Sequence, residues 1–244
     1  MTATMTDTMS TAMSALPSPN AIGRAETPMA FVKAIVMAYT QRGLDPRTAL
    51  STAQIAPSSL QQTEARITAA QMEWLSATAM RELDDEALGW FSRRLPWGSY
   101  GMLVRASLTA PTLGVALKRW CRHHGLLTDD IHLQIKQEQG VVSLQLQENR
   151  DLGALQEFCV VSVLRNVLGV ACWLTDSRIS LRQTNLRFAA PQHADSYRVL
   201  FDGPTQFNTA EHSLQFDAGY LSLPVRRDEA ALQRMLQRAL LLTV

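Results

Sequence analysis

The sequence predicts an α+β fold in which a helical N-terminal region packs with a small antiparallel sheet and a C-terminal helix. Apolar residues recur at helical spacing through residues 28–125. The period changes to alternate residues near Leu127, where a hairpin begins. One long apolar helix, over 152–174, separates the hairpin from several further short strands. Strands gathered in one sheet with helices segregated around it define the α+β class.

The first 27 residues differ in composition from the rest of the chain. They are rich in Thr, Ser, Met, Ala and Pro and show no sustained apolar period. Such a segment cannot bury enough surface to offset the entropy lost on ordering. We therefore predict a disordered tail over 1–27, followed by one compact unit over 28–225. Within that unit we expect a helical part, 28–125, and an α+β part, 126–225.

Helix signals follow one another through the helical part. The first helix has one apolar face and ends at Gly43. A second begins at Asp45-Pro46, with Asp as N-cap and Pro in the first turn. The apolar face of the first helix consists of Phe31, Ile35, Val36 and Tyr39.

Thr68 and Gln71 have the spacing of a capping box, and Ile67 with Met72 fits the apolar staple around it. A shorter helix is predicted over Ala87 to Phe91. The pattern breaks at LPWGSYGML and resumes after Pro111-Thr112. The helix that follows carries an apolar face of Leu113, Leu117 and Trp120.

The α+β part opens with two alternating runs around the turn Gln139-Gly140, which indicate a hairpin with one buried face. The apolar positions are Ile131, Leu133, Ile135, Val142, Leu144 and Leu146. After the long helix we expect a strand pair or one bulged strand over 179–188. A short helix over 194–201 leads to the turn Asp202-Gly203-Pro204. Two short strands follow, and Asp228-Glu229 opens the final helix.

Composition excludes several classes of protein. The formal net charge is +1, which gives no electrostatic footprint for nucleic acid or an anionic membrane. Three cysteines without CxxC or Cys/His zinc spacing favour reduced thiols in the cytoplasm, without a disulfide framework or structural metal. We find no apolar run of about 20 residues and no secretory signal, so we expect no membrane association.

Catalytic motifs are equally absent. The sequence contains no GxGxxG, GxxxxGK[ST] or GxSxG pattern, so we expect neither an enzyme nor a bound cofactor. The carboxylates Asp84-Asp85-Glu86 and Asp129-Asp130 resemble acid/base clusters, but we interpret them as capping or solvated groups. The run Trp120 to His124 offers a thiol and two imidazoles. Adjacent imidazoles point about 100° apart on a helix, so surface or capping roles are favoured over a metal site.

The segment over 191–232 combines structural signals in an unusual order: a short helix, a DGP turn, two short strands, YL, Pro224 and a new helix. This order resembles the end of the N-terminal effector domain in the arabinose-binding group of AraC/XylS-type transcription regulators. Two further segments, GSYGML at 98–103 and LTAPTLGVAL at 108–117, resemble a helix pair of that group. The likeness covers roughly residues 28 to 235.

The resemblance implies a domain that binds a small-molecule effector and oligomerises. Regulators of this group continue into two helix-turn-helix units, whereas this sequence stops inside an amphipathic helix. We therefore expect DNA binding only through a C-terminal part that is not in this chain. The chain itself is then either a piece of a longer regulator or a stand-alone sensor. The alternative function is a structural dimerisation or protein-interaction module without a ligand.

Two groups of residues are candidates for an effector site between the helical part and the sheet. Aromatic anchors with a guanidinium suit a small amphipathic or carboxylate ligand. The same residues also fit ordinary packing of a loop and a core helix, and this alternative stays open. The candidates are Trp97, Tyr100, Arg105, Phe158, Val161, Leu164 and Arg165.

The final segment, 226–244, is predicted to be a linker or dimerisation helix. Its apolar residues recur at i, i+3, i+4 and i+7. Such a stripe packs either on its own domain or against a second copy of the chain, and we expect a homodimer. The stripe consists of Leu232, Met235, Leu236 and Ala239.

Overall fold

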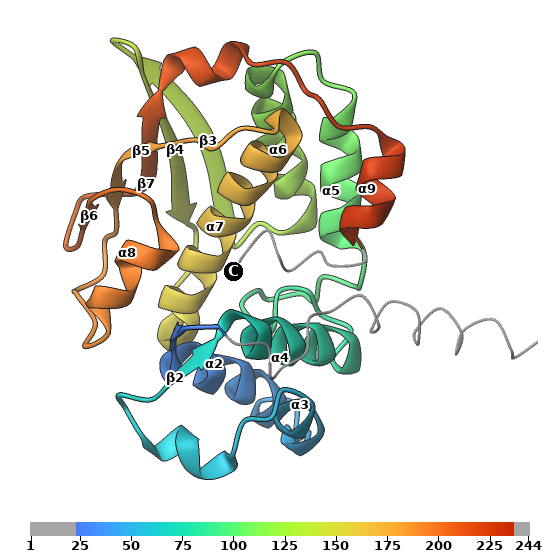
Figure 1. The fold of residues 1–244 in the computed structure, drawn as a ribbon, viewed down its shortest axis with the longest axis vertical. Coiled ribbons are helices and arrows are strands. Elements are labelled where there is room, and N and C mark those ends of the chain that lie inside the picture. Colours follow the sequence, from blue (N-terminus) through green and yellow to red (C-terminus); the bar gives the residue numbers. More distant parts are fainter. Residues whose placement is uncertain (1–22, 237–244) are drawn as a thin grey trace, which may run out of the picture.

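A computed structural model describes residues 23–236, and within them the predicted α+β class is confirmed (Figure 1). Helices surround a five-stranded sheet, a second sheet has two strands, and a helix ends the described chain. Residues 1–22 of the predicted tail and Ala239 lie outside the described residues.

The N-terminal region is not helical throughout, and this part of the prediction is corrected. Its elements are β1 (Ala25–Pro28), α2 (Met29–Thr40), α3 (Arg47–Thr52), a 3-10 turn (Pro57–Gln61), β2 (Arg66–Thr68) and α4 (Ala69–Glu82). Strands β1 and β2 pair antiparallel, so the end of the predicted tail, up to residue 27, is part of the fold. Pairing satisfies backbone groups of two segments that lack helical periodicity.

The local start signals of the helices act as predicted. The Thr68 side chain accepts a hydrogen bond from the Gln71 backbone N–H at 3.2 Å, and the Gln71 side chain accepts one from the Thr68 N–H at 3.0 Å. This capping box begins α4. At α3, Asp45 accepts a hydrogen bond from the Arg47 N–H at 2.9 Å, but the helix begins at Arg47, one residue later than predicted, so Pro46 occupies the N-cap position in place of Asp45.

Between α4 and α5 (Ser99–Leu108) the chain forms turns, and the predicted helix over Ala87 to Phe91 is wrong. Leu88 and Gly89 both have positive φ, 47° and 83°, which a right-handed helix does not allow. After α5 the chain enters α6 (Leu113–Leu127), whose buried residues repeat at helical spacing as predicted.

The five-stranded sheet has the order β3-β4-β7-β5-β6. Its strands are β3 (Ile131–Glu138), β4 (Val141–Glu148), β5 (Leu181–Asn185), β6 (Thr205–Gln206) and β7 (His212–Asp217). The predicted hairpin is β3-β4, and β5 is one strand with a register shift between Leu181 and Gln183. Strand β6 pairs parallel with β5, so the sheet is mixed rather than antiparallel. Between β5 and β6 the chain passes through a helical segment and a turn, so that β6 runs in the same direction as β5.

The long helix α7 (Gln156–Thr175), preceded by a 3-10 turn (Gly153–Leu155), runs along the sheet beside α6 (Figure 1). Helices α6 and α7 lie between the sheet and α5, while α2 to α4 sit at one end of α7. Gly153–Thr175 is long and apolar enough to cross a membrane by length and composition, contrary to our expectation from the sequence. Because 67% of that window is buried inside the domain, it serves here as a core helix.

The remaining elements complete the outer layer. A 3-10 turn (Ala194–Ser196) leads into α8 (Tyr197–Leu200), and a further 3-10 turn (Ala218–Ser222) follows β7. Helix α9 (Glu229–Leu236) packs against α5, and the Asp228 side chain caps it by accepting from the Ala231 N–H at 2.7 Å.

Candidate functional site

Buried carboxylates organise the loop between α4 and α5. The Asp85 side chain accepts hydrogen bonds from the backbone N–H groups of Ala87 (3.1 Å), Gly89 (2.9 Å) and Leu95 (3.0 Å), and it forms an ion pair with Arg42. Asp85 is 1% exposed. The sequence interpretation of Asp85 as a helix cap or a solvated group is wrong, because turns rather than a helix follow it and the loop folds around its buried carboxylate.

The neighbouring Glu86 fixes the start of α5. Its two carboxylate oxygens accept from the backbone N–H groups of Gly98 and Tyr100, each at 2.7 Å. Burial raises the pKa of Glu86, although these two hydrogen bonds act in the opposite direction. Through its backbone, Tyr100 is thus held in place by a carboxylate that lies fourteen residues earlier in the chain.

The Tyr100 ring contacts two aromatic residues of α6. It stacks on Trp120 with a centroid distance of 6.2 Å and an interplanar angle of 22°, and it lies 6.1 Å from the His124 ring. We call Tyr100, Trp120 and His124 the aromatic cluster. Trp120 and His124 are each 1% exposed.

The polar atoms of the aromatic cluster are buried without hydrogen-bond partners among the described residues. They are Tyr100 Oη, Trp120 Nε1, and both ring nitrogens of His124. Burial lowers the pKa of His124 to about 4, so the imidazole is neutral at pH 7. Since buried polar atoms in folded proteins are nearly always paired, four unpaired atoms on three neighbouring side chains are an uncommon concentration of such groups.

Surface roles are wrong for Cys121 and His124, which are buried, whereas Trp120 lies on the buried face of α6 as predicted. The sequence carried the signal, because His124 continues the helical spacing of Leu113, Leu117 and Trp120. Among the described residues no group of three or more His, Cys, Asp and Glu side chains could hold a metal ion.

Trp97 and Arg105 do not share the burial of Tyr100. Trp97 is 42% exposed, and the Arg81 guanidinium lies over its ring at 4.5 Å. Arg105 is exposed and pairs with Glu229 of α9 at 2.8 Å. Of the predicted residues Trp97, Tyr100 and Arg105, the structure therefore places only Tyr100 in the aromatic cluster.

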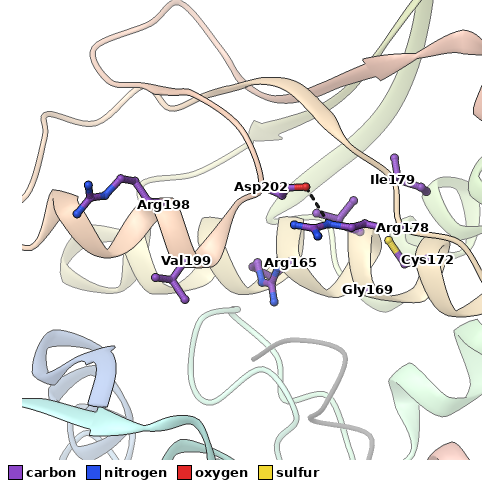
Figure 2. A pocket seen from close by; sticks show the side chains of 9 residues that line it. Arg165, Gly169, Cys172, Arg178, Ile179, Arg198, Val199 and Asp202 are labelled. Carbon is purple, nitrogen blue, oxygen red and sulfur yellow. Dashed lines mark hydrogen bonds and ion pairs between the residues drawn. The ribbon is translucent and has the colours of Figure 1, made fainter. Parts of the chain in front are cut away.

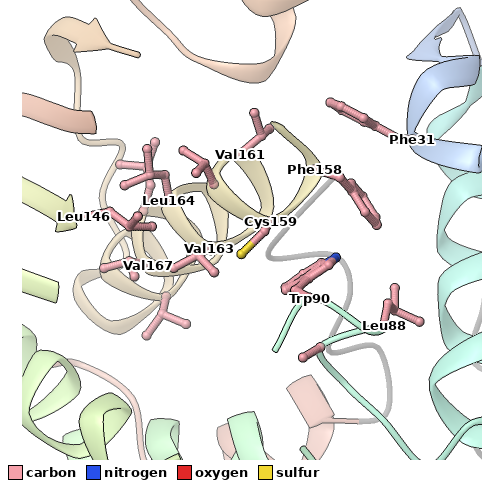
Figure 3. Packing of buried hydrophobic residues seen from close by; sticks show 14 of the residues in the cluster. Phe31, Leu88, Trp90, Leu146, Phe158, Cys159, Val161, Val163, Leu164 and Val167 are labelled. Atoms are coloured by element: carbon pink, nitrogen blue, oxygen red, sulfur yellow. The ribbon is translucent and has the colours of Figure 1, made fainter. Parts of the chain in front are cut away.

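The three apolar candidates on α7 lie in the hydrophobic core (Figure 3). Phe158 contacts Trp90 and Phe31, each with a centroid distance of 5.3 Å. Val161 and Leu164 are 2% and 0% exposed. Phe158 thus joins α7 both to α2 and to the loop that holds Tyr100.

Arg165, the fourth candidate on α7, lines a groove of about 390 Å³ between α7 and α8 (Figure 2). We call this the arginine groove. Its lining residues are Arg165, Leu168, Gly169, Cys172, Arg178, Ile179, Arg198, Val199 and Asp202. The groove and the aromatic cluster share no residue, so the seven predicted candidates divide between separate places in the fold.

Comparison with known proteins agrees with this architecture. The family model of the arabinose-binding domain of AraC transcription regulators, an N-terminal domain, matches residues 43–225, which is well over half of the chain. The chain belongs to this family. Membership in this AraC-type family supports an effector-binding regulatory role for the domain.

Two similar proteins come from Pseudomonas aeruginosa. The AraC-type domain is 23% identical over 212 residues to an ornithine utilization regulator, a match that covers 86% of this chain and 62% of the relative. The chain therefore spans about three fifths of that relative's length. The crystal structure of the transcriptional regulator CdpR is similar with a TM-score of 0.44 and 17% identity, covering 80% of this chain and 60% of CdpR.

Proposed function

We propose that this domain senses a small-molecule effector in the bacterial cytoplasm and controls DNA binding by a separate C-terminal part of an AraC-type regulator. We propose further that it acts as a homodimer and has no enzymatic activity. Family membership supports the regulatory role. The observation that carries the effector site is the set of orphaned polar atoms in the aromatic cluster.

The chemistry of the cluster indicates the class of effector. Tyr100 Oη and Trp120 Nε1 offer hydrogen-bond donors, and the neutral His124 ring offers one donor and one acceptor. Burial raises the pKa of Tyr100 well above the ordinary value, and the negative charges of Glu86 and Asp85 act in the same direction. An anion would be disfavoured in these surroundings. We therefore propose an uncharged molecule with a flat or apolar face and two or more hydrogen-bonding groups.

Helix α5 offers a route from the effector to the C-terminal helix. It carries Tyr100, and the adjacent Gly101 lies against Leu236 of α9, so that an added Cβ would approach a Leu236 methyl to 3.0 Å. Arg105 on α5 holds Glu229 at the start of α9. An effector that favours one position of α5 would shift the population of α9 positions.

The test is native mass spectrometry of the purified chain, followed by calorimetric titration with two probes, the uncharged L-arabinose and the charged L-ornithine, of which only the uncharged one should bind. Tyr100→Phe removes the orphaned hydroxyl and should lose the co-purified mass or weaken probe binding about tenfold. Tyr220→Phe makes the same chemical change in the 3-10 turn after β7 and should leave binding unchanged. A wild-type domain without a bound mass, insensitive to both probes, would favour the ligand-free dimerisation module.

The homodimer requires its own test. Leu232 is 0% exposed within its own chain, and Met235 and Leu236 pack against the same core. Ala239, the fourth residue of the predicted stripe, lies outside the described residues. A dimer would thus form through another surface or after α9 leaves α5. Sedimentation of the wild-type chain and of Leu232→Ala measures which applies: a dimer lost in the variant assigns α9 to the interface.

A further inference from the structure

The arginine groove lies on the side of α7 that faces α8 (Figure 2). Arg165, Leu168 and Cys172 line it from successive turns of α7, at spacings of three and four residues. Arg198 and Val199 come from α8, and Arg178 and Ile179 from the segment before β5. A volume near 390 Å³ is within the range of small-molecule sites.

The charge of the groove is not balanced by its own residues. Three arginines and one aspartate line the groove, and Asp202 already pairs with Arg178 at 2.9 Å. Arg165 Nε is buried without a hydrogen-bond partner, and no ion pair forms with Arg165 among residues 23–236. Arg198 donates from its Nε to the Asp195 carbonyl at 3.3 Å, which leaves its terminal N–H groups free to bind a ligand.

The buried position of Arg165 argues against a merely solvated arginine. Burial lowers the pKa of this guanidinium, since taking the charge out of water has a cost. A surface arginine without a partner is ordinary, but a buried N–H donor is normally satisfied. An anion in the groove would restore both the hydrogen bond and the charge balance.

Apolar side chains form the rest of the lining. Leu168 and Ile179 are 7% and 2% exposed, so they present only small surfaces from the packed interior. Val199 of α8 is 55% exposed, an unusual position for a branched apolar residue. A ligand that covers these side chains needs an apolar portion as well as an anionic group.

We propose that the arginine groove binds a small organic anion, a carboxylate or phosphate monoester with a short apolar portion. Arg165 holds the anionic group, Arg198 adds positive charge at the α8 side of the groove, and Leu168, Ile179 and Val199 contact the apolar portion. This site goes beyond the proposed effector function, because it lies apart from the aromatic cluster and prefers the opposite ligand charge.

The test titrates the purified chain with hexanoate and with phenyl phosphate by calorimetry. Inorganic phosphate lacks the apolar portion and 1-hexanol lacks the charge, so each reference compound omits one half of the recognition. We expect at least one amphipathic anion to bind about tenfold more tightly than both reference compounds. Equal binding of phosphate and phenyl phosphate, with no response to hexanoate, would overturn the apolar contact. No response to either amphipathic anion at 5 mM, roughly the weakest useful affinity, would overturn the site.

Variants assign the binding to the groove. Arg165→Gln should weaken it about tenfold, Arg165→Lys should recover part of the loss, and Arg198→Gln should weaken it about threefold. The control Arg122→Gln removes the same charge from an exposed position on α6. An equal loss in the control would overturn the proposal in favour of diffuse charge. Displacement of hexanoate by a short duplex DNA would assign these arginines to nucleic-acid phosphates and would also overturn it.

Cys172 provides a reporter in the unmodified protein. It is partly exposed and lines the groove, whereas Cys121 and Cys159 are buried. A bound anion should slow labelling of Cys172 by N-ethylmaleimide several-fold at pH 8.5. Unchanged labelling at saturating anion would place the ligand elsewhere. Tyr100→Phe should preserve this protection, so failure of the effector site and failure of the groove are distinguishable.

Discussion

Arg105 of α5 forms a forked contact with Glu229 of α9 across 124 residues of sequence, its Nε and terminal nitrogen both donating to the carboxylate. The pair lies at the surface, with the side chains 47% and 54% exposed. Arg105 therefore pairs with a residue of α9, whereas the sequence analysis predicted that it contacts a ligand. This ion pair joins the two helices.

Because both side chains are exposed, this ion pair should add little to the free energy of unfolding. We expect a double-mutant cycle of Arg105→Gln and Glu229→Gln to give a coupling free energy within the error of the measurement. Leu232→Ala, which truncates a wholly buried side chain of α9, should instead cost about 2–5 kcal/mol. Urea unfolding measures both, and hydrogen exchange in α9 shows whether that helix detaches first. A coupling free energy as large as the loss in Leu232→Ala would contradict the surface character of the pair.

The Asp85 carboxylate should be the most sensitive polar group in the loop before α5. Asp85→Asn removes the charge facing Arg42 and replaces one carboxylate oxygen with an NH2 group, so one or two of the three backbone N–H groups lose their acceptor. We expect a loss of about 3 kcal/mol in the free energy of unfolding. Asp129→Asn changes an exposed carboxylate in the same way and should shift stability by less than about 0.5 kcal/mol. Equal effects would mean that Asp85 does not organise the loop.

His124 should make the fold sensitive to mild acid. Its pKa in the folded chain, about 4, lies below the ordinary value of 6.5, so the unfolded chain binds the proton first as pH falls. The contribution of neutral His124 to the free energy of unfolding is complete above pH 6.5 and is lost progressively toward pH 4. Between pH 7 and pH 5 the wild type should lose about 2 kcal/mol more than His124→Phe. Denaturant titrations at both values measure this, with pH 8 as the baseline. Parallel pH profiles would contradict the buried neutral imidazole.

Gly203 supports the turn that returns the chain after α8. Its φ is 148°, and an added Cβ would lie 2.6 Å from the Leu181 carbonyl oxygen. We expect Gly203→Ala to destabilise the domain by about 2–3 kcal/mol through strain and displacement of β5. Gly125→Ala is the matched control, because a Cβ on that exposed residue of α6 meets nothing within 4 Å. It should stabilise the helix by up to about 1 kcal/mol. Opposite signs in thermal unfolding are the expected result.

Local signals were sufficient for much of the fold. The capping box at Thr68 and Gln71, the hairpin over 131–148 and the long helix ending at Thr175 all depend on residues a few positions apart. The spacing of α6 even placed His124 on the apolar face, although the sequence interpretation assigned it to the surface. The AraC-type family was evident from the order of such signals.

Other features depended on contacts between distant segments. Leu88 and Gly89 adopt positive φ because the loop wraps around Asp85, and no local pattern predicts that enclosure. The sheet is mixed because β6 meets β5 after an intervening helix and turn.

The sequence by itself determined most of the elements, their order and the family, because helix caps and apolar periods act over a few residues. The tertiary structure alone decided which candidate residues lie together. It placed Tyr100 against Trp120, gave Arg105 to Glu229, and gathered Arg165, Arg178 and Arg198 around one groove. The physical reason is that the burial and the charge partners of a side chain depend on which distant segments pack together. The identity of a side chain is compatible with several such partners and does not select one of them.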